Sequence, residues 1–210
     1  MNKLVVWFSL IAVAMIVAVG AYWYLDLRWR PRTITKNQAE IAALLEQSGW
    51  VSPGLGGPKL YMVGFRECAN CMAFKKDALP RLVEAGVDTR VIEFAWRDRN
   101  GQAQSTPAER ATVAELWINR SWTLMQRWDA TPVDAWKADG IPPADGDIAR
   151  TAVVEAGRDM VDKLTPLLKA NGIGFGTPLL IWWSKDGVMH GCACGSEAGW
   201  RYALKDLGAR

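Results

Sequence analysis

Two cysteines separated by two residues, Cys68 and Cys71, are the part of this sequence best suited to chemistry. They follow an apolar stretch, residues 60–65, that predicts a buried strand, and they precede residues 72–79, which predict a helix. The free N–H groups and the dipole at the start of a helix stabilise a thiolate, so the pKa of the Cys68 thiol should be lowered. Cys71, one helical turn further, can then resolve a mixed disulfide.

The same Cys-x-x-Cys spacing also occurs in zinc sites and in structural disulfides. A zinc site usually needs a second pair of ligands at a comparable spacing. The other two cysteines, Cys192 and Cys194, are separated by a single residue, which is too tight for a zinc knuckle. The strand, CxxC and helix in succession therefore favour a redox pair.

Length and composition narrow the function further. A chain of 210 residues is enough for about one domain with additional segments, and half of its residues are hydrophobic. The formal charge of +3 comes from scattered basic residues, which does not favour nucleic acid as a partner. The single histidine, His190, excludes sites with several histidine ligands, and no nucleophile is arranged with it as in a Cys–His hydrolase. Four cysteines in two close pairs fit an oxidising compartment.

Residues 1–25 predict a single transmembrane anchor. Residues 4–25 contain no charged side chain, and a helix of that length crosses a hydrocarbon core of about 30 Å. Trp23 and Tyr24 near its end are typical of a membrane interface. A cleavable signal peptide, with small residues at 18–20 as the cleavage site, is the alternative. We expect an uncleaved anchor, because the apolar stretch is long and aromatic residues follow the cleavage point.

The charges that flank this segment conflict with the thiol chemistry. Only Lys3 and the α-amine precede the segment, whereas several basic residues follow it: Arg28, Arg30, Arg32 and Lys36. The positive-inside rule would place the rest of the chain in the cytoplasm. Paired cysteines favour the periplasm instead. We give precedence to the cysteines and predict a single-pass protein of the bacterial inner membrane with a periplasmic catalytic domain.

Residues 26–58 are interpreted as a connector. Apolar residues at helical spacing predict one amphipathic helix between residues 35 and 48. The proline- and glycine-rich residues 52–58 then form a hinge before the first strand.

Residues 59–210 predict a domain with the element order β-α-β, a mostly helical insertion over about 97–171, and then β-β-α. Within the insertion, Thr106 and Glu109 predict a capping box at the start of a helix. Pro166 should interrupt the last helix of the insertion. The other expected elements are the CxxC helix to about residue 85, strands at 89–94, 176–183 and 188–192, and a final helix at 197–207.

This arrangement resembles the thioredoxin superfamily, and specifically the catalytic domain of bacterial disulfide isomerases of the DsbC/DsbG type. The matching features are the CxxC motif, the helical insertion, and Gly176-Thr177-Pro178 with the hairpin and helix that follow. The resemblance implies an α/β, thioredoxin-like fold over residues 59–210 and a cis Pro178 beside the CxxC. It also implies that Thr177 presents backbone groups to a substrate chain. The isomerases carry a separate N-terminal dimerisation domain, which residues 26–58 are too few to form.

The predicted function is a membrane-anchored thiol:disulfide oxidoreductase that needs no cofactor. Cys68 is the exposed nucleophile and Cys71 resolves the mixed disulfide, and the reduction potential decides whether the pair oxidises, reduces or isomerises its substrates. The expected partners are client proteins with thiols or disulfides and a redox partner protein in the membrane or periplasm. Glu67 and Lys75 are interpreted as solvated surface residues that tune the potential.

Two other functions remain open. The four cysteines are soft ligands that suit Cu(I), so the chain could be a thioredoxin-like metal chaperone. It could also be a thioredoxin-like partner module without catalysis, although the presence of both CxxC thiols argues against that.

Cys192 and Cys194 follow the last predicted strand, where a thioredoxin-like fold would place them near the CxxC. We interpret them as a second redox pair, as part of a four-thiolate metal site, or as an inert structural pair. A disulfide within Cys-x-Cys closes a tight ring, which favours reduction.

Overall fold

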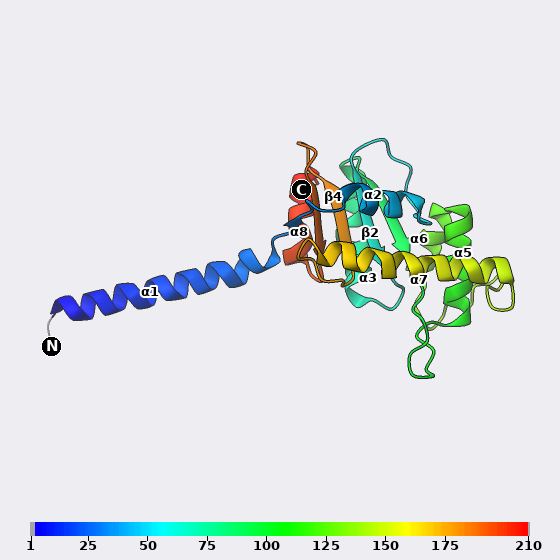
Figure 1. The fold of residues 1–210 in the computed structure, drawn as a ribbon, viewed down its shortest axis with the longest axis horizontal. Coiled ribbons are helices and arrows are strands. Elements are labelled where there is room, and N and C mark those ends of the chain that lie inside the picture. Colours follow the sequence, from blue (N-terminus) through cyan, green and yellow to red (C-terminus); the bar gives the residue numbers. More distant parts are fainter. Residues whose placement is uncertain (1–2, 210) are drawn as a thin grey trace. The chain divides into compact units, whose positions relative to one another are not determined.

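The computed structural model describes residues 3–209 and divides into two compact units, Met1–Arg30 and Pro31–Arg210 (Figure 1). The first unit contains helix α1, Lys3–Leu25, and a short 3₁₀ helix, Leu27–Trp29. The large apolar side chains of α1 that the structure describes are exposed. Within the described residues, no helix is both long enough and apolar enough to cross a membrane.

The second unit is built around a sheet with the strand order β1-β5-β4-β2-β3 in the described residues. Strands β2 and β3 run parallel, and each of the other neighbouring pairs runs antiparallel. The strands are β1 Arg32–Thr33, β2 Lys59–Gly64, β3 Asp88–Glu93, β4 Leu179–Trp183 and β5 Met189–Ala193.

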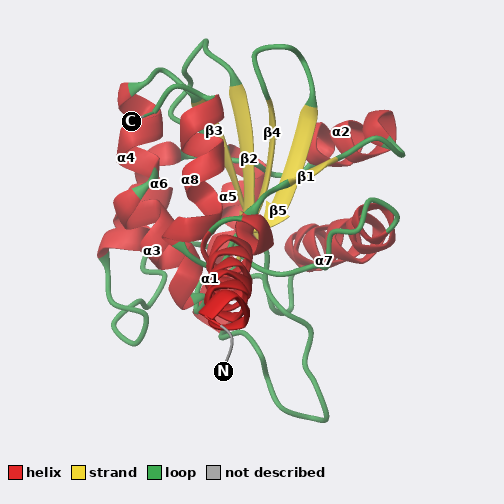
Figure 2. Cartoon of the chain, turned by 90° about the vertical axis from the view of Figure 1, so that its left-hand side faces the viewer, coloured by secondary structure: helices red, strands yellow, loops and turns green. Residues whose placement is uncertain are grey.

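Helices cover both faces of this sheet (Figure 2). Helices α2 and α7 lie on one face, and α3, α4 and α8 lie on the other. The predicted order β-α-β, helical insertion, β-β-α is confirmed. The helices are α2 Gln38–Gln47, α3 Ala69–Asp77, α4 Leu79–Glu84, α5 Pro107–Asn119, α6 Trp122–Ala130, α7 Ile148–Lys169 and α8 Glu197–Asp206.

Alternation of side chains along β2 produces two separate cores. Leu60 and Met62 contribute to the core under α3 and α8, whereas Tyr61 and Val63 contribute to the core under α2 and α7. All four side chains are fully buried. Burial of a large apolar side chain stabilises the folded state by about 1.5–3 kcal/mol, so β2 is fixed at the centre of the domain.

The segment that the sequence predicts as a connector is packed into the domain. Ile34, Ile41 and Leu45 are fully buried, and Val51 exchanges two backbone hydrogen bonds of 2.8 Å with β3. The amphipathic helix predicted here is present as α2, and its apolar face packs on α7. The structure therefore assigns residues 31–51 to the domain, because their apolar side chains complete one of its cores.

Three features of the helices differ from the predictions. The CxxC helix ends at Asp77 and α4 begins at Leu79, since Pro80 has no N–H to continue the first helix. Helix α7 continues through Pro166, which costs it one hydrogen bond near its end. Helix α6 was not predicted, although Ser121 caps it by accepting a hydrogen bond of 3.2 Å from a backbone N–H.

Candidate functional site

Cys68 and Cys71 form a disulfide in the first turn of α3, with their Cα atoms 5.1 Å apart. Cys68 is the N-cap residue of α3, and its Sγ accepts a hydrogen bond of 3.1 Å from the backbone N–H of Cys71. The first N–H groups of a helix have no partner within the helix and favour negative charge. The structure therefore places the first sulfur where a thiolate would be stabilised.

The disulfide is less accessible than the sequence predicts. Cys68 is only 7% exposed, although it was expected to be an exposed nucleophile, and Cys71 is fully buried. Cys71 packs against β2 at Gly64, where a Cβ would lie 2.9 Å from the Cys71 Sγ. The helix covers the sheet this closely because Gly64 has no side chain. Cys68 is the more accessible of the two sulfurs.

Pro178 lies beside this pair. The Thr177–Pro178 peptide bond is cis, the isomer that the resemblance implies. The ladder between β2 and β4 ends at the pair Val63–Leu179. Pro178, the residue before Leu179, therefore lies next to Gly64, on which Cys71 packs. Pro178 and the disulfide therefore share one end of the sheet.

Cys192 and Cys194 form a second disulfide at the same end of the sheet, with their Cα atoms 5.2 Å apart. The backbone N–H of Cys194 donates a hydrogen bond of 2.9 Å to the carbonyl oxygen of Pro178. Gly195 approaches the CxxC itself, since a Cβ at this position would lie 3.2 Å from the Asn70 Nδ2. The topology thus places the second cysteine pair at the same end of the sheet as the CxxC.

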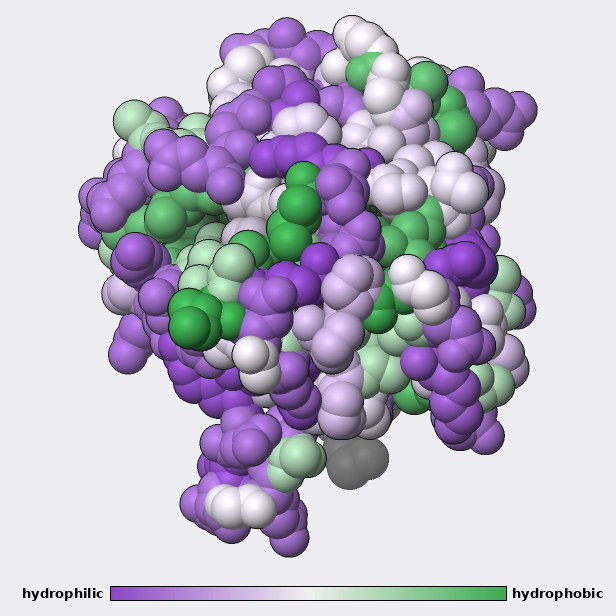
Figure 3. Space-filling model, turned by 90° about the vertical axis from the view of Figure 1, so that its right-hand side faces the viewer, coloured by the Kyte–Doolittle hydropathy of each residue, from purple (hydrophilic) through white to green (hydrophobic). Residues whose placement is uncertain are grey.

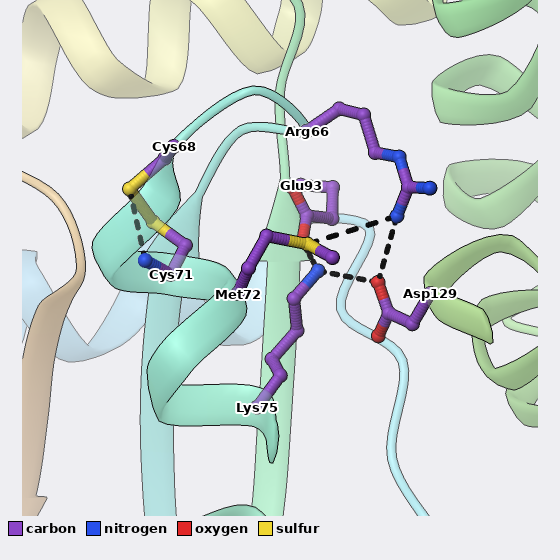
Figure 4. The surroundings of a disulfide bond; sticks show 7 residues. All are labelled: Arg66, Cys68, Cys71, Met72, Lys75, Glu93 and Asp129. Atoms are coloured by element: carbon purple, nitrogen blue, oxygen red, sulfur yellow. Dashed lines mark hydrogen bonds and ion pairs between the residues drawn. A yellow bond between two sulfur atoms is a disulfide. The ribbon is translucent and has the colours of Figure 1, made fainter. Parts of the chain in front are cut away.

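A cluster of buried charges lies beneath the CxxC turn (Figure 4). Lys75, one helical turn after Cys71, donates hydrogen bonds to the Glu93 Oε1 at 2.8 Å and to the Asp129 Oδ1 at 2.5 Å. The prediction that Lys75 is a solvated surface residue is wrong, because its side chain is only 4% exposed. It points inward because residues four positions apart share a helix face and Cys71 is buried.

Arg66 joins this cluster to the loop before the CxxC. Its Nη1 lies 3.4 Å from the Asp129 carboxylate, and its guanidinium group lies 5.3 Å from the centre of the Trp128 ring. It also donates a hydrogen bond to the carbonyl oxygen of Thr131. These partners lie in or directly after α6, so the cluster fixes the helical insertion to the CxxC loop. Sequence spacing did not identify these residues, since they come from separate elements.

Burial and ion pairing have opposite effects on the pKa values in this cluster. Burial alone would lower the pKa of Lys75, but the carboxylates of Glu93 and Asp129 outweigh it, so the pKa of Lys75 is raised. Burial raises the pKa of Asp129, and Lys75 only partly offsets this effect. The Glu93 Oε2 is buried and has no hydrogen-bond partner among the described atoms. Lys75 is thus held as a cation by two buried acids.

Glu109 is another buried acid near the CxxC loop. Its backbone N–H donates to the Thr106 Oγ1 at 3.1 Å, and its carboxylate accepts a hydrogen bond of 3.3 Å from the Thr106 N–H, so the predicted capping box is confirmed. Burial raises the pKa of Glu109 to about 7. The hydrogen bond from Thr106 lowers this pKa, whereas the negative charges of Glu67 and Glu93 raise it.

An open depression of about 720 Å³ adjoins the CxxC loop on the side of the insertion. It begins at Glu67, which is exposed, as predicted. Apolar side chains line much of the remainder, including Val133, Trp136, Ile141 and Pro143. Figure 3 views the molecule from the side where Figure 1 labels α5 and α6, and hydrophobic residues there form separate patches among hydrophilic ones.

The other candidate chemistries receive no geometric support. Among the described residues, no three His, Cys, Asp or Glu side chains are grouped so that they could hold a metal ion. His190 lies in β5 with its ring 5.6 Å from the ring of Trp182, as expected for a histidine packed in a sheet.

No protein-family model and no curated protein matches the sequence. Solved structures with a similar fold include two forms of one protein. One is the catalytic domain of ScsC from Proteus mirabilis, which matches with a TM-score of 0.51 at 16% identity, over 81% of this chain and 96% of that chain. The other is a linker-deletion mutant of the same protein, with a TM-score of 0.52 at 17% identity, over 99% of this chain and 93% of that chain. Together with the strand order, this similarity establishes a thioredoxin-like fold.

We predict that Lys75→Ala lowers the free energy of unfolding by about 3–5 kcal/mol, because it leaves the buried Glu93 without a cation and Asp129 with Arg66 alone. Urea denaturation followed by tryptophan fluorescence measures the change. Lys76→Ala is the matched control, since the neighbouring Lys76 is exposed and should alter stability by no more than about 0.5 kcal/mol. Similar losses in the two variants would contradict the buried cluster.

We predict that Glu109→Gln removes a pH dependence from the stability. The pKa of Glu109 is raised on folding from 4.5 to about 7. The protonated side chain therefore contributes fully to the free energy of unfolding below pH 4.5, and this contribution is lost as the pH rises through 7. Glutamine can keep the capping box but cannot ionise. The variant should therefore become more stable than the wild type at pH 8, by up to ~3 kcal/mol, and should show no such gain at pH 4.5. Parallel stability profiles between these pH values would refute the raised pKa.

Proposed function

We propose that this protein is a thiol:disulfide oxidoreductase that exchanges disulfides with client proteins through Cys68 and Cys71. The observation that carries the proposal is the position of the Cys68 Sγ at the start of α3, where it accepts the N–H of Cys71. In the reduced protein the same donor would stabilise a Cys68 thiolate, the form that attacks disulfides. Cys71 lies one turn deeper and is fully buried, which suits a resolving cysteine.

The exchange needs no cofactor, because the electrons pass between sulfur atoms. In client reduction, the Cys68 thiolate attacks a client disulfide and forms a mixed disulfide, and one client sulfur leaves as a thiolate. The Cys71 thiolate then attacks the Cys68 Sγ, which releases the second client thiolate and closes the Cys68–Cys71 bond. Two electrons have moved to the client, and the reverse sequence oxidises a client dithiol.

We assign the contact with the client chain to Thr177 and Pro178. Pro178 lies beside the Cys71 packing site on β2, as its register with Gly64 requires. Thr177 precedes β4 and is outside the ladder between β2 and β4. Its backbone groups are therefore in a position to pair with an extended client segment next to the reactive sulfur.

We also propose that residues 4–25 anchor the protein in a bacterial inner membrane, with the remaining residues in the periplasm. The sequence from 4 to 25 is free of charged residues and has Trp23 and Tyr24 near its end. Two disulfides fit an oxidising compartment such as the periplasm. The basic residues after the apolar stretch favour the opposite orientation, so the location needs a direct test.

The proposed activity is tested with purified, metal-free protein. After reduction, the protein should reduce insulin disulfides, and Cys68→Ala should abolish this activity. Metal content measured after anaerobic purification separates the alternative function, since a copper chaperone should bind about one metal ion per chain. A protein that binds about one metal ion per chain and does not reduce insulin would be a metal chaperone, and the proposed activity would be wrong.

We predict that Cys71→Ala accumulates mixed disulfides with client proteins in cells. The variant can still attack through Cys68, but it has no thiol to resolve the product. Non-reducing gels should show adducts that disappear in Cys68→Ala/Cys71→Ala. Adducts that persist in the double variant would show that Cys68 is not the attacking residue.

We predict that alkaline phosphatase fused after the last residue is active in cells and that the fusion stays in membranes after a carbonate wash. The phosphatase folds only where its disulfides form, so its activity reports a periplasmic location. A fluorescent-protein fusion at the same position is the converse control. An inactive phosphatase with a fluorescent cytoplasmic fusion would support the orientation that the basic residues favour.

A further inference from the structure

The second disulfide plays no part in the exchange described above, yet it faces the same side of the sheet. Cys192 pairs with Leu180 of β4, and Leu180 belongs to the core under α3 and α8. Cys194 lies two residues further, directly after β5, and belongs to the same core. Cys68, Cys71 and Cys194 are members of this one hydrophobic cluster, and Cys192 packs against it.

The strand register places the two pairs close together. Gly64 ends β2, Pro178 directly precedes β4 and Cys194 directly follows β5, so the three form a row at one end of the sheet. The carbonyl oxygen of Pro178 accepts a hydrogen bond from the N–H of Cys194. Neighbouring strands are about 4.8 Å apart, so this row is roughly 10 Å long. Cys71 covers one end of the row and Cys194 is the other end.

The loop after β5 shortens this separation. Gly195 follows Cys194 directly and lies so near Asn70, the residue before Cys71, that a Cβ on Gly195 would be 3.2 Å from the Asn70 Nδ2. Cys194 is 2% exposed, so its sulfur is shielded from solvent thiols, whereas Cys192 is partly exposed. The second pair thus has a buried sulfur next to the CxxC and an outer sulfur that a partner can reach.

A structural role explains this disulfide poorly. It joins residues only two positions apart. The gain in stability from a disulfide increases with the length of the loop that it closes, so a bond this local restricts the unfolded chain very little.

We propose that Cys192–Cys194 is a second redox pair that exchanges electrons directly with Cys68–Cys71, an inference that rests on the proposed function. The Cys68 thiolate attacks the Cys194 Sγ, the bond to Cys192 breaks, and Cys192 leaves as a thiolate. The Cys71 thiolate then attacks the Cys68 Sγ, and Cys194 leaves as a thiolate.

The step balances without an added reagent. Two electrons and two protons pass from the Cys68–Cys71 dithiol to the Cys192–Cys194 disulfide. A client dithiol supplies the electrons to the first pair. The disulfide of a partner protein, attacked by Cys192, accepts them from the second pair.

The first test compares the wild type with Cys68→Ser/Cys71→Ser. Each oxidised protein receives less than one equivalent of dithiothreitol under anaerobic conditions, and alkylation with mass spectrometry follows the reduction of Cys192–Cys194. In the wild type, Cys192–Cys194 should be reduced at least tenfold faster than in the double variant, because the electrons from dithiothreitol arrive through the CxxC. Equal rates in the two folded proteins would overturn the proposal.

The second test traps the intermediate. Cys71→Ser/Cys192→Ser should form an intramolecular Cys68–Cys194 disulfide when treated with oxidised glutathione, and peptide mapping should identify it. Circular dichroism confirms that the variant is folded. A folded variant that takes up glutathione at Cys68 but forms no such bond would also overturn the proposal.

Insulin reduction separates this inference from the proposed function. Reduced Cys192→Ser/Cys194→Ser should still reduce insulin in a single turnover through the CxxC. If it does, and the rates in the first test are equal, only the second redox pair fails. If the reduced wild type does not reduce insulin, the proposed function itself fails.

Discussion

The contact between Cys71 and the backbone of β2 at Gly64 determines the geometry of the whole site. A side chain at this position would meet the sulfur at 2.9 Å, so only glycine lets the first turn of α3 lie directly on the sheet. Once the turn is there, the register of β4 places Pro178 beside it, and Cys194, directly after β5, donates a hydrogen bond to Pro178. Two cysteine pairs and a proline from distant parts of the chain thus meet at one end of the sheet.

The insertion contributes the electrostatics of this site. Asp129 in α6 pairs with Lys75 in α3, and Lys75 also pairs with Glu93 at the end of β3. Buried ion pairs add little net stability compared with apolar packing, because desolvation offsets most of the attraction. What this cluster provides is position, because Lys75 links Glu93 of β3 to Asp129 of α6 and its removal leaves the buried Glu93 unpaired. The insertion is therefore fixed to the helix that carries the CxxC.

Sequence patterns predicted the parts of this structure that depend on local chemistry. The strand before Cys68, the capping box of Thr106 and Glu109, and the order of the elements all follow from periodicity and end signals. The buried state of Lys75 did not follow, because its partner Asp129 lies 54 residues away and two consecutive lysines usually indicate a solvated face. Residues 31–51 were misassigned for a similar reason, since only the folded sheet shows what Ile41 and Leu45 cover.

Sheet and insertion consequently control different properties of the same reactive pair. The sheet sets which sulfur atoms meet, through Gly64, Pro178 and Cys194, and a change there alters access to the disulfide. The insertion supplies Asp129, which sets the charge around Lys75, one helical turn from Cys71. In a buried site of low effective dielectric constant, such charges act over several ångströms. A substitution in α6 can therefore alter the relative stability of thiolate and disulfide while the row of residues that presents them stays in place.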